Sequence, residues 1–162
     1  MGQATHVCSI GSFFASRWPA PEEIRQYFFE DLDWEADGSF FLYGAQGTEN
    51  EDPYSKRIDI SLAVFLIPDV GMVLHWSKAG GGHSEHFYSR GDVLLYGQFA
   101  SDGLGELISG AFVISPDQAW LAVTDFILRD GCRSDRIAWL DEADLPDEAI
   151  PPDVGETLPV IE

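Results

Sequence analysis

The chain has 162 residues, which fits one domain, and 45% of them are hydrophobic and 13% aromatic, which excludes a disordered chain. Only nine Lys and Arg residues stand against 28 Asp and Glu residues, so the formal net charge is −19. A surface this acidic repels phosphate backbones and anionic lipids, so we expect neither nucleic acid nor membrane as a partner; basic proteins are favoured. Acidity alone is equally compatible with a role in solubility.

The cysteines and the apolar segments indicate a cytoplasmic protein. Cys8 and Cys132 match no metal-binding spacing; they could pair, but free thiols in an intracellular chain are the favoured interpretation. The first six residues lack the basic and apolar regions of a signal peptide. The longest apolar run, from Leu62 to Leu74, is interrupted by Pro68 and is too short to span a bilayer.

The first half of the chain predicts a helix followed by strands. Residues 6–14 form either a first strand or an ordered arm. A helix is predicted to begin at Pro21, because proline suits the first helical position and the next residues, Glu22 and Glu23, suit the positive end of the helix dipole. It leads into an acidic segment that ends at Gly38. Strands are then predicted over residues 40–43, 57–66 and 71–76, the second of which has one entirely apolar face.

The middle of the chain predicts short strands joined by short turns. Strands are expected over residues 83–89, 93–99 and 106–114. Three glycines, from Gly80 to Gly82, precede the first of them, and we expect an irregular turn there with at least one positive φ angle. Connections this short favour an antiparallel meander.

The clearest element is a helix that begins after Ser115. Ser115 and Gln118 have the spacing of a capping box, and Pro116 occupies the first helical position. Gly131 can adopt the left-handed conformation that ends a helix. A short strand is expected after it, over residues 137–140. One apolar stripe repeats at helical spacing and should be buried against the sheet: Ala119, Ala122, Val123, Phe126 and Ile127.

These elements predict an α+β fold: an antiparallel meander sheet of about six strands with two main helices packed on one face. We place a single domain at residues 1–140 and an acidic tail at residues 141–162. Eight acidic residues and four prolines, but no Lys or Arg, occupy that tail. Such a composition is typical of a disordered or extended segment, unless the tail packs back on the domain or a partner holds it.

The grouping of His83, Glu85 and His86 suggests metal binding or acid–base catalysis. Side chains alternate along a strand, so residues 83 and 85 would share one face and His86 would lie on the other. The spacing matches no established zinc motif, and a recognition surface or a solvated strand edge is the favoured interpretation. The sequence contains no nucleophile elbow and no phosphate-binding loop, so we expect no catalytic residue, no metal and no cofactor.

Two stretches of the chain together resemble the motifs of one known protein family. Residues 80–92 contain the glycine pair, the aromatic-Ser pair and the Gly-Asp pair of that family. Residues 119–139 are similar to its closing helix, in which an Ala-x-x-Ala-Val-x-acid-Phe pattern leads to a glycine, a basic residue and a final Ile-x-Trp. The upstream hairpin at residues 57–76 also fits, so the resemblance covers roughly residues 20–140. The family that this region resembles is bacterial immunity protein family one, the antitoxins of polymorphic toxin systems.

The resemblance implies an antitoxin that binds a toxin domain, often a nucleic-acid deaminase or nuclease, and so protects the cell that produces it. Such toxins carry basic surfaces that hold nucleic acid, so a strongly acidic inhibitor would suit one. Two alternatives remain. One is a small intracellular hydrolase that uses Glu85 together with His83 or His86, and the other is an acidic adaptor or nucleic-acid mimic without a toxin.

Candidate contacts with the toxin combine acidic side chains with an aromatic residue or with the glycine segment. Aromatic contacts and hydrogen-bonded charged contacts are expected to supply most of the binding energy. The candidates are Asp31, Asp33, Trp34, Glu35 and Asp37 at the end of the first helix, His83, Glu85, His86 and Tyr88 after the glycines, and Asp102 in a hairpin loop.

Overall fold

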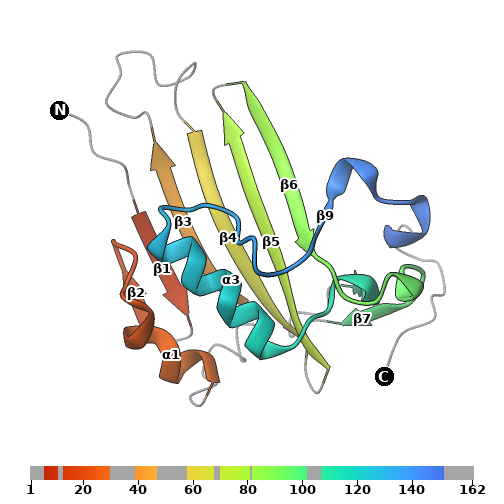
Figure 1. Cartoon of the computed structure of the whole chain (residues 1–162), viewed down its shortest axis with the longest axis horizontal. Coiled ribbons are helices and arrows are strands. Elements are labelled where there is room, and N and C mark those ends of the chain that lie inside the picture. Colours follow the sequence, from red (N-terminus) through yellow and green to blue (C-terminus); the bar gives the residue numbers. More distant parts are fainter. Residues whose placement is uncertain are drawn as a thin grey trace.

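A seven-stranded antiparallel sheet forms the centre of the molecule (Figure 1). The computed structural model describes residues 6–10, 13–29, 39–46, 58–67, 70–80, 82–101 and 107–151. Along the sheet the strands follow the order β2-β1-β3-β4-β5-β6-β9. Their bounds are His6–Ile10 for β1, Phe13–Ala15 for β2, Ser39–Gln46 for β3, Ile58–Ile67 for β4, Gly71–Gly80 for β5, His83–Ser89 for β6 and Trp139–Asp141 for β9.

In the described ranges, the remaining elements are two α-helices, a two-stranded sheet and short 3-10 helices. The α-helices are α1 (Pro21–Phe29) and α3 (Pro116–Leu128), and the small sheet pairs β7 (Phe99–Ser101) with β8 (Leu107–Ser109). The 3-10 helices are η2 (Val93–Leu95), η3 (Gly110–Phe112), η4 (Glu142–Asp144) and η5 (Asp147–Ala149). Within the described ranges, no helix is both long and apolar enough to cross a membrane.

Short connections give the main sheet its meander. β4 pairs with β5 along almost its whole length, and β5 then pairs with β6. At the connection between β5 and β6, Gly80 and Gly82 have φ angles of 102° and 86°, whereas Gly81 lies outside the described residues. The antiparallel meander and the positive φ angle among the glycines are therefore both confirmed.

Both α-helices cover the same face of the sheet (Figure 1). Phe126 on α3 is only 1% exposed, and Val123 is fully buried, as the helical spacing predicted. α1 adds Ile24 and Phe28, which are also fully buried. These side chains pack against alternate residues of the strands, which include Leu42, Ile60, Leu62, Val64, Leu74 and Trp76. Two helices on one face of an antiparallel sheet confirm the predicted α+β fold.

Both ends of α3 carry the signals that the sequence predicted. The Ser115 hydroxyl accepts a hydrogen bond from the backbone N–H of Gln118, and the capping box is complete. After the helix, Asp130 and Gly131 have positive φ angles of 55° and 85°. Nε1 of Trp76 donates a 2.9 Å hydrogen bond to the carbonyl oxygen of Gly131, and this bond ties the end of the helix to β5.

A second, smaller core lies on the opposite face, at one end of the sheet. Val73 points away from the helices, because its neighbours Met72 and Leu74 belong to the main core. Phe112 of η3 and Ala149 of η5 pack in the same cluster as Val73, and Ala149 is only 3% exposed. The acidic segment after residue 140 therefore packs back on the domain as far as Pro151, where the described residues end.

Two expected strands are partly wrong. Residues 93–99 begin as η2, because the carboxylate of Asp92 accepts a hydrogen bond from the backbone N–H two residues later and caps a turn. Residues 106–114 include the short strand β8, which ends at Ser109. The Ser109 hydroxyl accepts a hydrogen bond from the backbone N–H of Ala111 and so caps η3. In both places a polar side chain binds a backbone amide that a longer strand would have paired.

Both cysteines are free thiols. Cys8 is fully buried in the main core, and Cys132 is exposed after α3. Burial raises the pKa of Cys8 to about 12, so this thiol stays protonated and is a poor nucleophile.

Candidate functional site

The face of the sheet opposite α1 and α3, here called the distal face, carries polar and aromatic side chains. They alternate along each strand with the buried residues of the main core. Within the described ranges, both α-helices pack on the other face. The distal face comprises Phe41 and Tyr43 on β3, Asp59, Ser61 and Ala63 on β4, His75 and Ser77 on β5, and His86 and Tyr88 on β6.

Cross-strand neighbours over β3, β4 and β5 bind one another. The Tyr43 hydroxyl donates to Oδ1 of Asp59 at 2.6 Å, and the hydroxyl oxygens of Ser61 and Ser77 lie 2.7 Å apart. Phe41 stacks beside Tyr43, with ring centroids 6.1 Å apart, and 38% of its surface is exposed. This half of the distal face therefore offers a partner both an aromatic surface and hydrogen-bonding groups.

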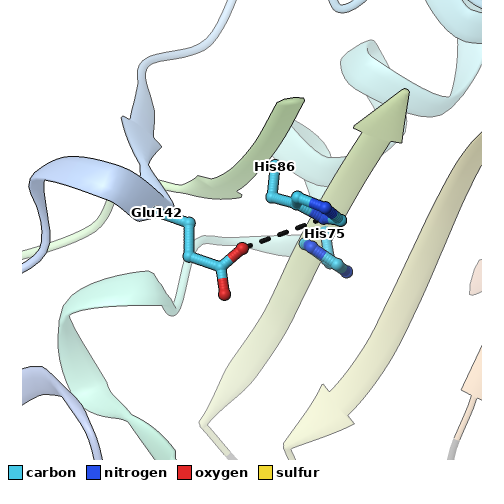
Figure 2. Close-up of side chains that lie close together, drawn as sticks. All are labelled: His75, His86 and Glu142. Carbon is cyan, nitrogen blue, oxygen red and sulfur yellow. Dashed lines mark ion pairs between the residues drawn. The ribbon is translucent and has the colours of Figure 1, made fainter. Parts of the chain in front are cut away.

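Two histidines and a glutamate meet at the other side of the distal face, over β5 and β6 (Figure 2). One potential ligand atom from each of His75, His86 and Glu142 lies within 4.8 Å of the other two. Nδ1 of His86 is 3.8 Å from Oε2 of Glu142, and the two imidazole rings are nearly parallel, with centroids 5.5 Å apart. These three residues are called the histidine cluster below.

The register of β5 and β6 brings the aromatic rings together. His75 lies directly opposite Tyr88, and the ring centroids of the two are 4.6 Å apart. His86 precedes Tyr88 by two residues, so it occupies the diagonal position on the same face. The ring of His75 is consequently held between those of His86 and Tyr88.

Strand β9 brings the glutamate to the two histidines. β9 pairs with β6 so that Asp141 lies opposite Phe87 at the edge of the sheet. The Asp141 carboxylate accepts a hydrogen bond from the backbone N–H of Ala143 and caps η4. Glu142 is the first residue of that turn, and Figure 2 shows its carboxylate directed toward the imidazole of His86.

Burial and charge set the protonation of the groups around the cluster. Burial lowers the pKa of His75, and nearby His86 lowers it further, while Glu142 partly offsets both effects. Burial also raises the pKa of Tyr88, and the charge of Glu142 adds to that increase. At physiological pH the imidazole of His75 is therefore neutral and the phenol of Tyr88 keeps its proton.

A cavity of about 500 Å³ adjoins the histidine cluster. Its polar side is formed by His75, Tyr88 and Glu142. The ring of Tyr88 stacks on Phe112 with centroids 4.4 Å apart, and this pair forms an aromatic wall. Other apolar side chains, which include Phe65, Val73 and Leu145, complete the lining. The cavity can accept an apolar side chain of a bound protein or a small molecule.

The structure divides the predicted contact residues of β6 between the two faces of the sheet. His86 and Tyr88 lie on the distal face, whereas Glu85 lies on the helix side, in a hollow that Lys78 and Arg133 also line. The expected placement of Glu85 and His86 on opposite faces is therefore confirmed. A hydrolase that pairs Glu85 with His86 in one site has no support in this geometry.

The remaining predicted contact residues fall beyond what the structure describes. For His83, the backbone in β6 is described but the side chain is not. The residues that lie wholly outside the described ranges are Asp31, Asp33, Trp34, Glu35, Asp37 and Asp102.

Sequence reasoning missed His75 and Glu142. His75 stands between the apolar residues Leu74 and Trp76, so the alternation of its strand already contained the signal for its face. Glu142 carried no such local signal, because its place depends on the pairing of β9 with β6, which are far apart in the sequence.

Comparison of the chain with protein-family models, curated proteins and solved structures finds no match.

Proposed function

We propose that this protein is an immunity protein, which binds and neutralises a cognate bacterial toxin domain. The observation that carries the proposal is an acidic segment beside the distal face. Residues 141–148 contain five acidic side chains and no Lys or Arg, and one of them, Glu142, reaches the histidine cluster. The resemblance of residues 80–92 and 119–139 to immunity protein family one supports the same function.

The charge favours a toxin that acts on nucleic acid. A deaminase or nuclease holds its polyanionic substrate on a basic surface, and an inhibitor with a net charge of −19 is attracted to that surface. Once bound there, the inhibitor excludes the substrate. Its own acidity keeps it away from nucleic acid, so the toxin is the partner that the charge selects.

The distal face is the proposed contact surface. α1 and α3 occupy the other face of the sheet, whereas Phe41 presents a half-exposed ring beside the hydrogen-bonded pair of Tyr43 and Asp59. His86 and Tyr88 extend this surface toward the cavity. Aromatic contacts of this kind carry most of the binding energy in protein interfaces, while acidic residues at the rim chiefly raise the association rate.

Titration of toxin activity tests the proposal. The purified protein is added to a candidate toxin domain taken from a neighbouring gene, and deamination or cleavage of nucleic acid is followed. We expect activity to disappear at one equivalent of the protein, because the complex covers the substrate-binding surface. A toxin that keeps its activity at saturating protein would contradict the immunity function.

A pair of variants tests the contact surface. Phe41→Ala is expected to weaken toxin binding about tenfold or more, mainly through faster dissociation. Leu128→Ala is the control, because it removes an apolar side chain that is 67% exposed on α3, away from the distal face. If Leu128→Ala weakened binding and Phe41→Ala did not, the contact surface would lie on the helix side of the sheet, and the immunity function would still stand.

A further inference from the structure

We propose that the histidine cluster binds a divalent transition-metal ion of the zinc class. His75, His86 and Glu142 come from β5, β6 and η4, and their potential ligand atoms lie within 4.8 Å of one another (Figure 2). This inference concerns the isolated chain and does not depend on a toxin partner.

The donor atoms select the class of ion. Two imidazole nitrogens and one carboxylate oxygen form a donor set that suits zinc and its neighbours in the first transition series. Calcium and magnesium prefer sites made of oxygen ligands alone. Three protein ligands also leave at least one coordination position for water or for an incoming group.

The potential ligand atoms lie somewhat farther apart than a bound ion requires. In a tetrahedral zinc site, bonds of about 2.0–2.1 Å place the ligand atoms about 3.3 Å apart. His86 and Glu142 are already close to this spacing, with Nδ1 and Oε2 3.8 Å apart. Both side chains are partly exposed, at 35% and 49%, so an ion can enter from solvent and they have room to adjust.

One imidazole ring has to rotate. The lone pair of an imidazole nitrogen lies in the ring plane, and two nearly parallel rings therefore do not direct their lone pairs at one point. His75 is held between two other rings, so we assign the rotation to His86, which has a stacked neighbour on one side only in the described part of the chain.

An unpartnered nitrogen in the cluster supports an ion or water there. Nε2 of His75 is buried, and no described atom forms a hydrogen bond with it. Buried polar atoms in native proteins nearly always have a hydrogen-bonding partner. Because Nε2 of His75 lies among other potential ligand atoms, we expect it to bind an ion or a water molecule there. An ion bound to the cluster, with its water, supplies such a partner.

Zinc titration of the metal-free protein tests the inference. Isothermal titration calorimetry with Zn²⁺ is expected to show one site per chain with a dissociation constant in the micromolar range or below. His86→Gln and Glu142→Gln should each weaken this binding about tenfold or more, since each removes one ligand. Co²⁺ should give visible absorption bands with the wild type that disappear in the His86→Gln variant.

Two matched variants serve as controls. Glu85→Gln changes a carboxylate on the same strand but on the opposite face, and His6→Gln changes a histidine on β1 beside Trp18. Both should bind Zn²⁺ like the wild type. Circular dichroism checks that each variant is folded, and Glu142→Gln, at a half-exposed side chain, decides the question if His86→Gln does not fold. Wild-type binding only in the millimolar range, or binding unchanged by Glu142→Gln, would overturn the site.

Discussion

Arg136 binds the carboxylate of Asp125 through two hydrogen bonds, from Nε at 2.9 Å and from a terminal nitrogen at 2.7 Å. The Ser134 hydroxyl donates to the same carboxylate, which is largely buried on α3. The hydrogen bond from Arg136, reinforced by that from Ser134, holds the pKa of Asp125 below its ordinary value against the opposing effect of burial. These bonds fix the chain that leads from the end of α3 to β9.

Removal of the negative charge of Asp125 should destabilise the fold to an extent that depends on pH. Asp125→Asn is expected to lower the free energy of unfolding by about 1–3 kcal/mol at pH 7, because hydrogen bonds to a charged acceptor are lost. The folded-state pKa of Asp125 lies below the unfolded value of about 3.9, so its contribution is present above that pH. The contribution is lost as pH falls through the folded-state pKa.

Urea unfolding of wild type and variant from pH 7 to pH 3 measures this effect. The difference in stability should be constant from pH 7 to about pH 5 and should shrink below about pH 4. Asp144→Asn, at an exposed position of η4, is the control and should change stability little at any pH. A difference that stays constant down to pH 3 would show that the charge of Asp125 is not what stabilises the fold.

Gly131 should not tolerate a side chain. Its φ angle is +85°, and an added Cβ would lie 3.0 Å from Ile60 and 3.2 Å from Trp18. Gly131→Ala is therefore expected to lower the unfolding free energy by about 1–3 kcal/mol. Gly97→Ala is the matched control, because its Cβ would meet no atom of the described residues closer than 3.9 Å. Thermal unfolding of both variants checks the prediction, and equal melting temperatures would contradict it.

Phe126 should be a principal contributor to the main core. Its ring is 1% exposed, and its centroid is 4.8 Å from that of Trp18. Phe126→Ala is expected to cost about 3–5 kcal/mol, because a large buried side chain is lost and a cavity remains. Leu128→Ala on the same helix, at a 67% exposed position, should cost far less. Comparable losses in denaturant unfolding would show that α3 buries a different face.

The sequence predicted α3 and the hairpin of β4 and β5 well, because the signals for both are local. The capping box at Ser115, the apolar stripe and the left-handed Gly131 all lie within one helix and its ends. The alternation of β4 is likewise contained in ten consecutive residues. Expected strands over 93–99 and 106–114 were wrong in part because short polar side chains favoured turns, which apolar content alone does not reveal.

The candidate site was predictable only in part. His86 and Tyr88 were identified because they follow the glycine segment, and their face follows from strand alternation. The histidine cluster as a whole could not be predicted, because it needs the diagonal placement of His75 and the edge pairing of β9. Both depend on register between strands, which no local pattern contains.

If the proposed immunity function is correct, removal of acidic residues beside the distal face slows association with the toxin domain. A triple variant, Asp144→Asn with Asp147→Asn and Glu148→Gln, removes three exposed charges of η4 and η5. Stopped-flow mixing with the toxin domain is expected to give a several-fold lower association rate and a nearly unchanged dissociation rate. Asp117→Asn with Glu22→Gln removes exposed charges on the helices and should have a smaller effect. If both variants lowered the association rate equally, the net charge of the protein, and not the position of its acidic residues, would determine the rate.

The most direct test of the proposed immunity function is the association rate of this protein with the proposed toxin partner across a salt series. Charges farther apart than about 8–10 Å are screened at physiological ionic strength, so attraction between this protein, with its charge of −19, and a basic toxin partner would weaken as salt rises. We predict a several-fold fall in association rate from low to physiological salt, with a smaller change in dissociation. An association rate indifferent to salt would contradict electrostatic steering, and the absence of binding at every salt concentration would contradict the immunity function itself.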